Sequence, residues 1–144
     1  MIYYHGTTIE RGRRILEDRK IIPTNSNTMI YPDTDYSRTT LGYVYLTTDA
    51  NKALDFASRT QKKTGKIKIA IFGIDISDND VEIDVDELKY DSNSSNEFRI
   101  NYELILGEHV KRYAFIEAGS YKQLCKIIDN RKADEAIKNI WKTI

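Results

Sequence analysis

The segment from Ile67 to Ile76 most constrains the fold of this chain, because its side chains alternate between apolar and polar and then become continuously apolar. That pattern is typical of a strand buried inside a sheet. The longest uninterrupted apolar run within it, residues 69–74, is far shorter than the roughly 20 residues that span a bilayer. We therefore expect a soluble globular protein with this strand in its interior and with no membrane span.

The remaining hydrophobic pattern predicts strand, helix, loop, strand, helix, several strands and a helical end. A chain of 144 residues is long enough for one domain with a real core and too short for two. Strands dominate the middle without regular βαβ alternation, which favours an α+β domain. The predicted elements are a strand at 2–5, a helix at 9–19, a long polar loop at 23–41, a strand at 43–47, a helix after Asp49, a strand at 67–76, an extended edge segment at 81–85, strands at 98–106 and 110–116, and helices at 121–128 and 133–144.

The charge balance excludes some classes of partner. Lys plus Arg number 22 and Asp plus Glu number 22, so nothing global recruits nucleic acid or an anionic membrane. The charges are concentrated in basic runs at 11–20 and 62–68 and in an acidic run at 75–87. The simplest interpretation is that each run forms a solvent-exposed face, and the alternative for the basic runs is a phosphate-binding site. The single Cys125, the lack of a zinc-spaced Cys/His cluster and the lack of an apolar N-terminal leader favour a cytoplasmic protein without a metal.

Three short segments carry the residues that indicate a function. In the first, Tyr4-His5-Gly6-Thr7-Thr8, a strand ends and a helix begins. A glycine after a strand-end histidine lets a ligand approach the backbone closely, so that the N–H and C=O of Gly6 could bind an amide. Taken alone, a single histidine is more often structural than functional.

The second and third segments add aromatic and acidic side chains. In residues 42–57 a strand runs into a helix; alternation puts Tyr43 and Tyr45 on one face of the strand, and Phe56 on the helix could close over whatever Tyr45 touches. Core packing of these rings is the alternative. In residues 98–110, Glu103 interrupts an otherwise apolar strand. An unpaired buried carboxylate is costly, so Glu103 either has a specific role or faces solvent.

In this order the three segments resemble the ADP-ribosyltransferase superfamily, in its His-Tyr-Glu branch of diphtheria-toxin-like and poly(ADP-ribose)-polymerase-like enzymes. Residues 5–7 match the family's His-Gly-Thr strand, and residues 42–57 match its Gly-x-x-Tyr strand and Ala-rich helix. Glu103, ahead of a hydrophobic run, matches its glutamate. The resemblance implies a split two-sheet α+β catalytic domain at 1–118, with C-terminal helices at 119–144 packed on the same domain.

The resemblance also implies the substrate, NAD, and a role for most of the matching residues. His5 would bond the adenosine ribose, Gly6 the nicotinamide carboxamide, and Glu103 the nicotinamide ribose 2′-OH, where it would support positive charge at the anomeric carbon. Tyr45 and Phe56 would flank the nicotinamide ring. No metal is implied.

Five further positions come from the same comparison or lie near it. Thr7 and Ala53 occupy cofactor-binding motif positions, although Ala53 stands where polymerase-type enzymes carry a small hydroxyl. Arg38 in the long loop, with Arg13 and Arg14, is a candidate for the pyrophosphate.

The implied activity is mono-ADP-ribosyl transfer to a protein or nucleic-acid acceptor, as in bacterial or phage effectors and toxins, in the cytoplasm or after secretion into a host cell. A NAD glycohydrolase would use the same residues. An RNA 2′-phosphotransferase would carry a His-x-His strand where this chain has Tyr43-Val44-Tyr45. A non-catalytic nucleotide- or partner-binding module is the alternative from another class. Asn101 stands where the Arg-modifying branch has a second acid, which disfavours arginine as the acceptor.

Overall fold

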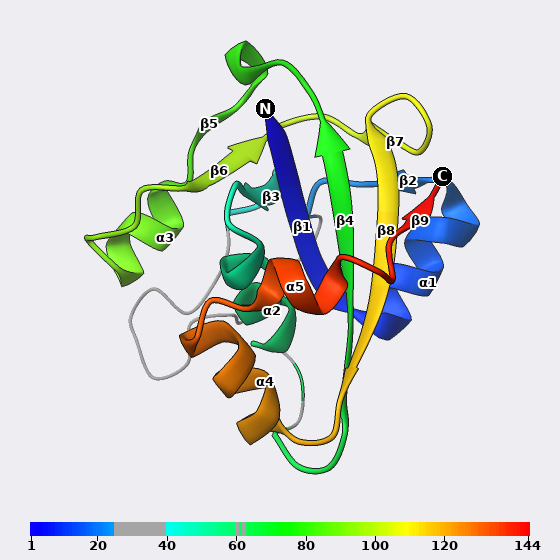
Figure 1. Ribbon diagram of the computed structural model, residues 1–144. Coiled ribbons are helices and arrows are strands. Elements are labelled where there is room, and N and C mark those ends of the chain that lie inside the picture. Colours follow the sequence, from blue (N-terminus) through cyan, green and yellow to red (C-terminus); the bar gives the residue numbers. More distant parts are fainter. Residues whose placement is uncertain (25–39, 60, 62) are drawn as a thin grey trace.

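The computed structural model describes residues 1–24, 40–59, 61 and 63–144 of the chain (Figure 1). Its elements follow the predicted order closely at the N-terminus and less closely after residue 80. They are β1 (Ile2–Thr8), α1 (Ile9–Asp18), β2 (Lys20–Ile21), β3 (Val44–Thr47), α2 (Ala50–Ser58), β4 (Ile67–Asp75), the 3-10 turn η1 (Asp78–Asp80), β5 (Glu82–Ile83), α3 (Val85–Tyr90), β6 (Glu97–Ile100), β7 (Leu104–Ile105), β8 (Val110–Ala118), α4 (Tyr121–Asp129), α5 (Ala133–Ile137) and β9 (Lys142–Thr143).

A seven-stranded sheet forms the centre of the molecule, in the order β5-β6-β3-β1-β4-β8-β9. Its strand pairs are antiparallel, and β2 and β7 form a second, two-stranded antiparallel sheet. Figure 1 shows α2, α4 and α5 in front of the large sheet and α1 beside β8. The fold is therefore α+β, as the predicted element order indicates.

β4 is an interior strand of the large sheet, which confirms the prediction for residues 67–76. It pairs with β1 from Asp75 opposite Ile2 to Ile69 opposite Thr8, and with β8 on its other side. Alternation sends Phe72 and Ile74 to one face of the sheet and Ile69 and Ile71 to the other, and all four side chains are fully buried. One strand thus supplies the core on both faces.

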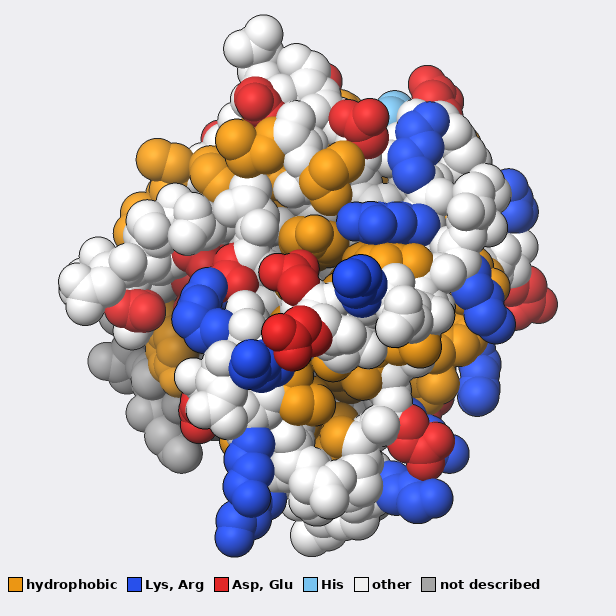
Figure 2. All heavy atoms as spheres, viewed as in Figure 1, with side chains coloured by type: hydrophobic (Ala, Val, Ile, Leu, Met, Phe, Trp, Pro, Cys, Tyr) orange, Lys and Arg blue, Asp and Glu red, His pale blue; other side chains and the backbone are white. Residues whose placement is uncertain are grey.

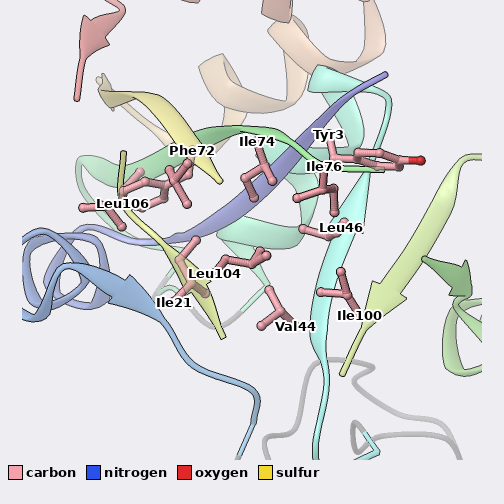
Figure 3. Close-up of a cluster of buried hydrophobic side chains, with 12 residues drawn as sticks. Tyr3, Ile21, Val44, Leu46, Phe72, Ile74, Ile76, Ile100, Leu104 and Leu106 are labelled. Carbon is pink, nitrogen blue, oxygen red and sulfur yellow. The ribbon is translucent and has the colours of Figure 1, made fainter. Parts of the chain in front are cut away.

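The two faces carry separate hydrophobic cores. Between the large sheet and the small β2–β7 sheet, Ile21 and Leu104 pack with Val44, Leu46 and Phe72 (Figure 3). On the opposite face, α2, α4 and α5 cover the sheet with a second set of side chains, which includes Ala53, Leu54, Ile69, Ile71, Leu124 and Ile137. The small sheet is therefore held to the large one by hydrophobic packing as well as by backbone bonds.

Two predicted elements are wrong in their extent. The strand expected at 98–106 is broken by a bend at residues 101–102, so that β6 joins the large sheet and β7 the small one. The helix expected at 133–144 ends at Ile137. Beyond it, Trp141 stacks on Tyr4, and β9 pairs with β8, because strand pairing on the outer edge of β8 satisfies backbone groups of the last residues.

The acidic run is also different from the expected solvated face. Asp84, Asp86 and Glu87 are exposed by 7% or less, whereas the apolar Ile83 and Val85 beside them are 58% and 40% exposed. The edge strand β5 is present, but α3 begins at Val85, within the segment expected to be extended. The carboxylates turn inward because cationic side chains from distant elements meet them there, as described below.

One face of the molecule can be followed in Figure 2. On the face shown in Figure 2, acidic and basic side chains are interspersed with hydrophobic ones and do not gather into one charged patch. In the described part of the chain, no helix has the length and apolar character needed to cross a membrane.

Candidate functional site

His5 marks the point at which β1 and β3 separate. The register between these strands places Tyr4 opposite Thr47. One residue further along β1, the side chain of His5 contacts β3: its Nδ1 lies 2.9 Å from the carbonyl oxygen of Tyr45. Because a carbonyl only accepts hydrogen bonds, Nδ1 is the atom that carries the proton.

The protonation state of His5 determines which ring nitrogen can accept a hydrogen bond. Burial lowers the pKa of His5 below its ordinary value; the bond to the Tyr45 carbonyl acts against this shift, and the charge of Arg11 adds to it. The imidazole is therefore neutral at pH 7. With the proton on Nδ1, Nε2 is a hydrogen-bond acceptor.

Backbone alternation determines where the polar groups of Gly6 point. The N–H of Thr48 donates to the carbonyl of Asn96 in the strand connection next to β6. The backbone groups of Thr48 therefore face β6, and because successive residues of a strand face opposite sides, those of Tyr45 and Thr47 face β1. Tyr4 is opposite Thr47, so the backbone groups of Tyr4, and those of Gly6 two residues later, face β3. Since His5 bonds the Tyr45 carbonyl, the N–H and C=O of Gly6 face the place where the two strands diverge.

Gly6 also lets α2 lie unusually close to β1. A Cβ at this position would lie 2.0 Å from the backbone oxygen of Ala53, so any other residue would force the helix away. Ala53 itself is fully buried in the second core, and its methyl group is not exposed to a ligand. Thr7 is 8% exposed, and Thr8 accepts a bond from the N–H of Arg11 as the N-cap of α1.

The small sheet takes over the edge of β3 that β1 has left. The N–H of Thr24, which follows β2, donates to the carbonyl of Tyr43 at 2.9 Å, and the N–H of Gly42 donates back to Thr24 at 2.8 Å. The edge of β3 is thus paired with β1 at one end and with the continuation of β2 at the other. His5 lies between these two pairings.

Glu103 lies at the end of the small sheet that is nearest to this junction. It precedes β7, in which Leu104 is opposite Ile21, so it lies opposite the part of the β2 chain that leads to Thr24. Its side chain is 49% exposed, and Oε1 accepts a bond from Lys20 at 3.4 Å. Within the part of the chain that is described, no hydrogen bond joins Glu103 to His5 or Tyr45.

Tyr45 and Phe56 both lie beside α3. The Tyr45 hydroxyl donates to Asp86 at 2.6 Å. The Phe56 ring lies under the guanidinium of Arg59, 4.6 Å from its centroid, and Arg59 bonds Glu87, the neighbour of Asp86. Both rings are half-buried. Burial, with the hydrogen bond to Asp86, raises the pKa of Tyr45 well above its ordinary value, so it remains a neutral phenol.

The remaining candidates are less informative. Arg38 lies outside the described residues. Arg13 and Arg14 are exposed on α1. The structure adds Arg11, whose charge acts on His5, and Lys20, which bonds Glu103. Nothing local in the sequence singles out these two from the other cations of the basic N-terminal run.

Comparison with known proteins gives no independent assignment: no family model, curated protein or solved structure matches the chain. Across residues 1–24, 40–59, 61 and 63–144, no group of three or more His, Cys, Asp or Glu side chains is arranged to hold a metal ion. The residues at the β1–β3 divergence are therefore the basis for the chemistry of the site.

Proposed function

We propose that this chain is a NAD-dependent mono-ADP-ribosyltransferase, with the split two-sheet fold of that superfamily. The observation that carries the proposal is the orientation of Gly6, whose backbone N–H and C=O point to the place where β1 leaves β3. A carboxamide needs one donor for its oxygen and one acceptor for its NH₂ group. A single strand residue with both groups pointing the same way supplies this pair.

The neighbouring side chains support a dinucleotide with its nicotinamide at Gly6. Nε2 of His5 is an acceptor and matches a ribose hydroxyl, which can donate to it. Tyr45 and Phe56 offer flat, half-buried rings beside the same strands, and such rings stack on a planar heterocycle. Positioning of the ring in this way is itself a large part of catalysis.

Glu103 supplies the charge that the reaction requires. Breaking the bond between nicotinamide and ribose creates an oxocarbenium-like centre, and a fixed carboxylate stabilises that centre more strongly than the ground state. The nucleophile of the acceptor then bonds the anomeric carbon, neutral nicotinamide leaves with the bonding electrons, and the acceptor's proton goes to solvent. Loss of such a carboxylate costs on the order of 10²-fold in rate.

The first test is the substitution Glu103→Gln, which keeps the shape of the side chain and removes its charge. We expect nicotinamide release from NAD, measured by chromatography, to fall at least about tenfold, while the Kd for NAD changes by less than about twofold. Glu108→Gln is the matched control, because Glu108 lies in the next turn and is 70% exposed. Full activity of Glu103→Gln would overturn the role of this residue.

A second experiment identifies the acceptor. Wild-type protein is incubated with NAD labelled in the adenosine half, with and without a cell lysate, and the label is followed into protein, RNA and DNA. Label in a macromolecule supports a transferase. Nicotinamide release without label transfer would replace it with a glycohydrolase. Binding of NAD, seen as a thermal shift, without any nicotinamide release would indicate a binding module and overturn the enzymatic proposal.

A further inference from the structure

The hydroxyl of Tyr45 is held by a charged acceptor. Its oxygen lies 2.6 Å from Oδ2 of Asp86 and 2.9 Å from the carbonyl oxygen of Thr40. A phenol has one proton to donate, and the shorter contact to a carboxylate is the stronger of the two. The ring of Tyr45 is thereby fixed by a side chain that comes from α3, a different element from its own strand.

Asp86 is itself held firmly and stays ionised. Its carboxylate accepts from the N–H of Thr40 at 2.9 Å and from the Thr40 hydroxyl at 2.8 Å, and Arg99 approaches it at 3.9 Å. Burial by itself would raise the pKa of Asp86. The bonds from Tyr45 and Thr40, with the charge of Arg99, outweigh burial and hold that pKa below its ordinary value.

The consequence for the ring is electronic as well as geometric. A phenol that donates to an anion gains electron density in its π system, and an electron-rich ring attracts a cation placed over its face. The nicotinamide of NAD⁺ is a pyridinium cation, whereas the dihydronicotinamide ring of NADH and the ring of free nicotinamide are neutral. An ionised Asp86 behind Tyr45 therefore favours the charged ring over the neutral ones.

We propose that Asp86 is a positioning residue that orients and polarises Tyr45 for the pyridinium ring of NAD⁺. This inference rests on the proposed function and goes one step further, because it assigns the preference for the oxidised dinucleotide to a residue that does not touch the substrate. A merely structural Asp86 would affect NAD⁺ and NADH equally.

The test compares Asp86→Asn with Tyr45→Phe, which removes the hydroxyl and keeps the ring. We expect each variant to raise the Kd for NAD⁺ about three- to tenfold and the Kd for NADH by less than about twofold. Both act on one hydrogen bond, so the double variant should lose no more than either single one. Asp78→Asn is the matched control, since Asp78 accepts a 2.8 Å bond from Tyr3 elsewhere in the molecule.

Each outcome separates the two proposals. Equal losses for NAD⁺ and NADH, or NAD⁺ binding unchanged in both variants while wild type binds it, would overturn the role of Asp86 and leave the proposed function intact. A wild type that neither binds nor cleaves NAD would overturn the proposed function and this inference with it. If Asp86→Asn fails to fold, Tyr45→Phe alone decides, since its carboxylate partner remains in place.

Discussion

The environment of Asp84 differs from the solvated one that its position in an acidic run indicates. The residue is 1% exposed at the start of α3, where it accepts a bond from the N–H of Glu87, and its Oδ2 has no hydrogen-bond partner among the residues that the structure describes. Burial raises the pKa of Asp84 to about 7; the bond from Glu87 opposes this, and the negative charges of Asp86 and Glu87 add to it. An ordinary surface aspartate would be ionised throughout the physiological range.

This raised pKa predicts a pH-dependent stability. Between 3.8 and about 7 the folded state retains a proton on Asp84 that the unfolded state has released. The free energy of unfolding therefore falls as pH rises through that window, with a contribution from Asp84 of at most about 1.4 kcal/mol per pH unit. We expect Asp84→Asn, which keeps an N-cap side chain, to remove this contribution and to be more stable than wild type above pH 7.

Urea unfolding of both proteins across the window measures the effect. The difference in the free energy of unfolding between wild type and variant isolates the effect of Asp84, because the other carboxylates titrate in both proteins. Asp129→Asn, at an exposed aspartate of α4, is the control and should follow the wild-type pH dependence. Parallel curves for wild type and Asp84→Asn would contradict the protonated state of Asp84.

At the scale of elements, α3 depends on a buried ion pair for its place in the fold. It has six residues, which is too short for a helix to be stable by itself. Arg59, the C-cap residue of α2, makes two bonds to the fully buried carboxylate of Glu87, at 2.9 and 3.1 Å, and Lys52 adds a contact at 3.3 Å. The pairing joins α2 to α3 beside Tyr45 and Phe56.

Removal of one partner of this buried ion pair should therefore lower the free energy of unfolding far more than removal of one partner of a surface ion pair. We expect Arg59→Met to lower the free energy of unfolding by about 3–5 kcal/mol, because it leaves the Glu87 charge buried with less compensation. Arg131→Met is the matched control, since Arg131 pairs with Asp49 at 3.0 Å but is 69% exposed, and about 1 kcal/mol or less is expected. Both losses come from denaturant titrations, and equal values would contradict the buried character of the Arg59 pair.

At the scale of the whole molecule, the two cores are joined through shared strands. β4 sends Phe72 and Ile74 into one core and Ile69 and Ile71 into the other. Loss of β4 would therefore disrupt both cores. We therefore expect the small sheet and the C-terminal helices to unfold as parts of one cooperative structure.

This arrangement predicts a single unfolding transition. Trp141, the one tryptophan of the chain, packs against the second core and stacks on Tyr4, with the two ring centroids 6.2 Å apart. Its fluorescence therefore reports the C-terminal segment, whereas far-ultraviolet circular dichroism reports all elements. We expect both signals to give the same denaturant midpoint. A lower midpoint for the fluorescence would mean that the C-terminal segment unfolds separately.

Much of the backbone could be predicted because its causes are local. The alternation of residues 67–76 predicts β4, and Thr8 and Asp49 cap the helices that follow them. The candidate residues His5 and Tyr45 lie on adjacent strands and are joined through the Tyr45 carbonyl. Their functional roles, with that of Glu103, stay predictions until substrate binding and turnover are measured.

What only the tertiary structure decided is which polar groups are buried and where strands exchange partners. The acidic run looks solvated in the sequence, because Arg59 lies 28 residues from Glu87 and Tyr45 lies 41 residues from Asp86. Residues 98–106 look like one strand because hydrophobicity does not record that the chain changes sheets at a bend. The sequence by itself determined most of the elements up to β4 and the candidate motifs, since both depend on neighbouring residues. Charge burial and strand pairing depend on segments that meet only when the chain has folded.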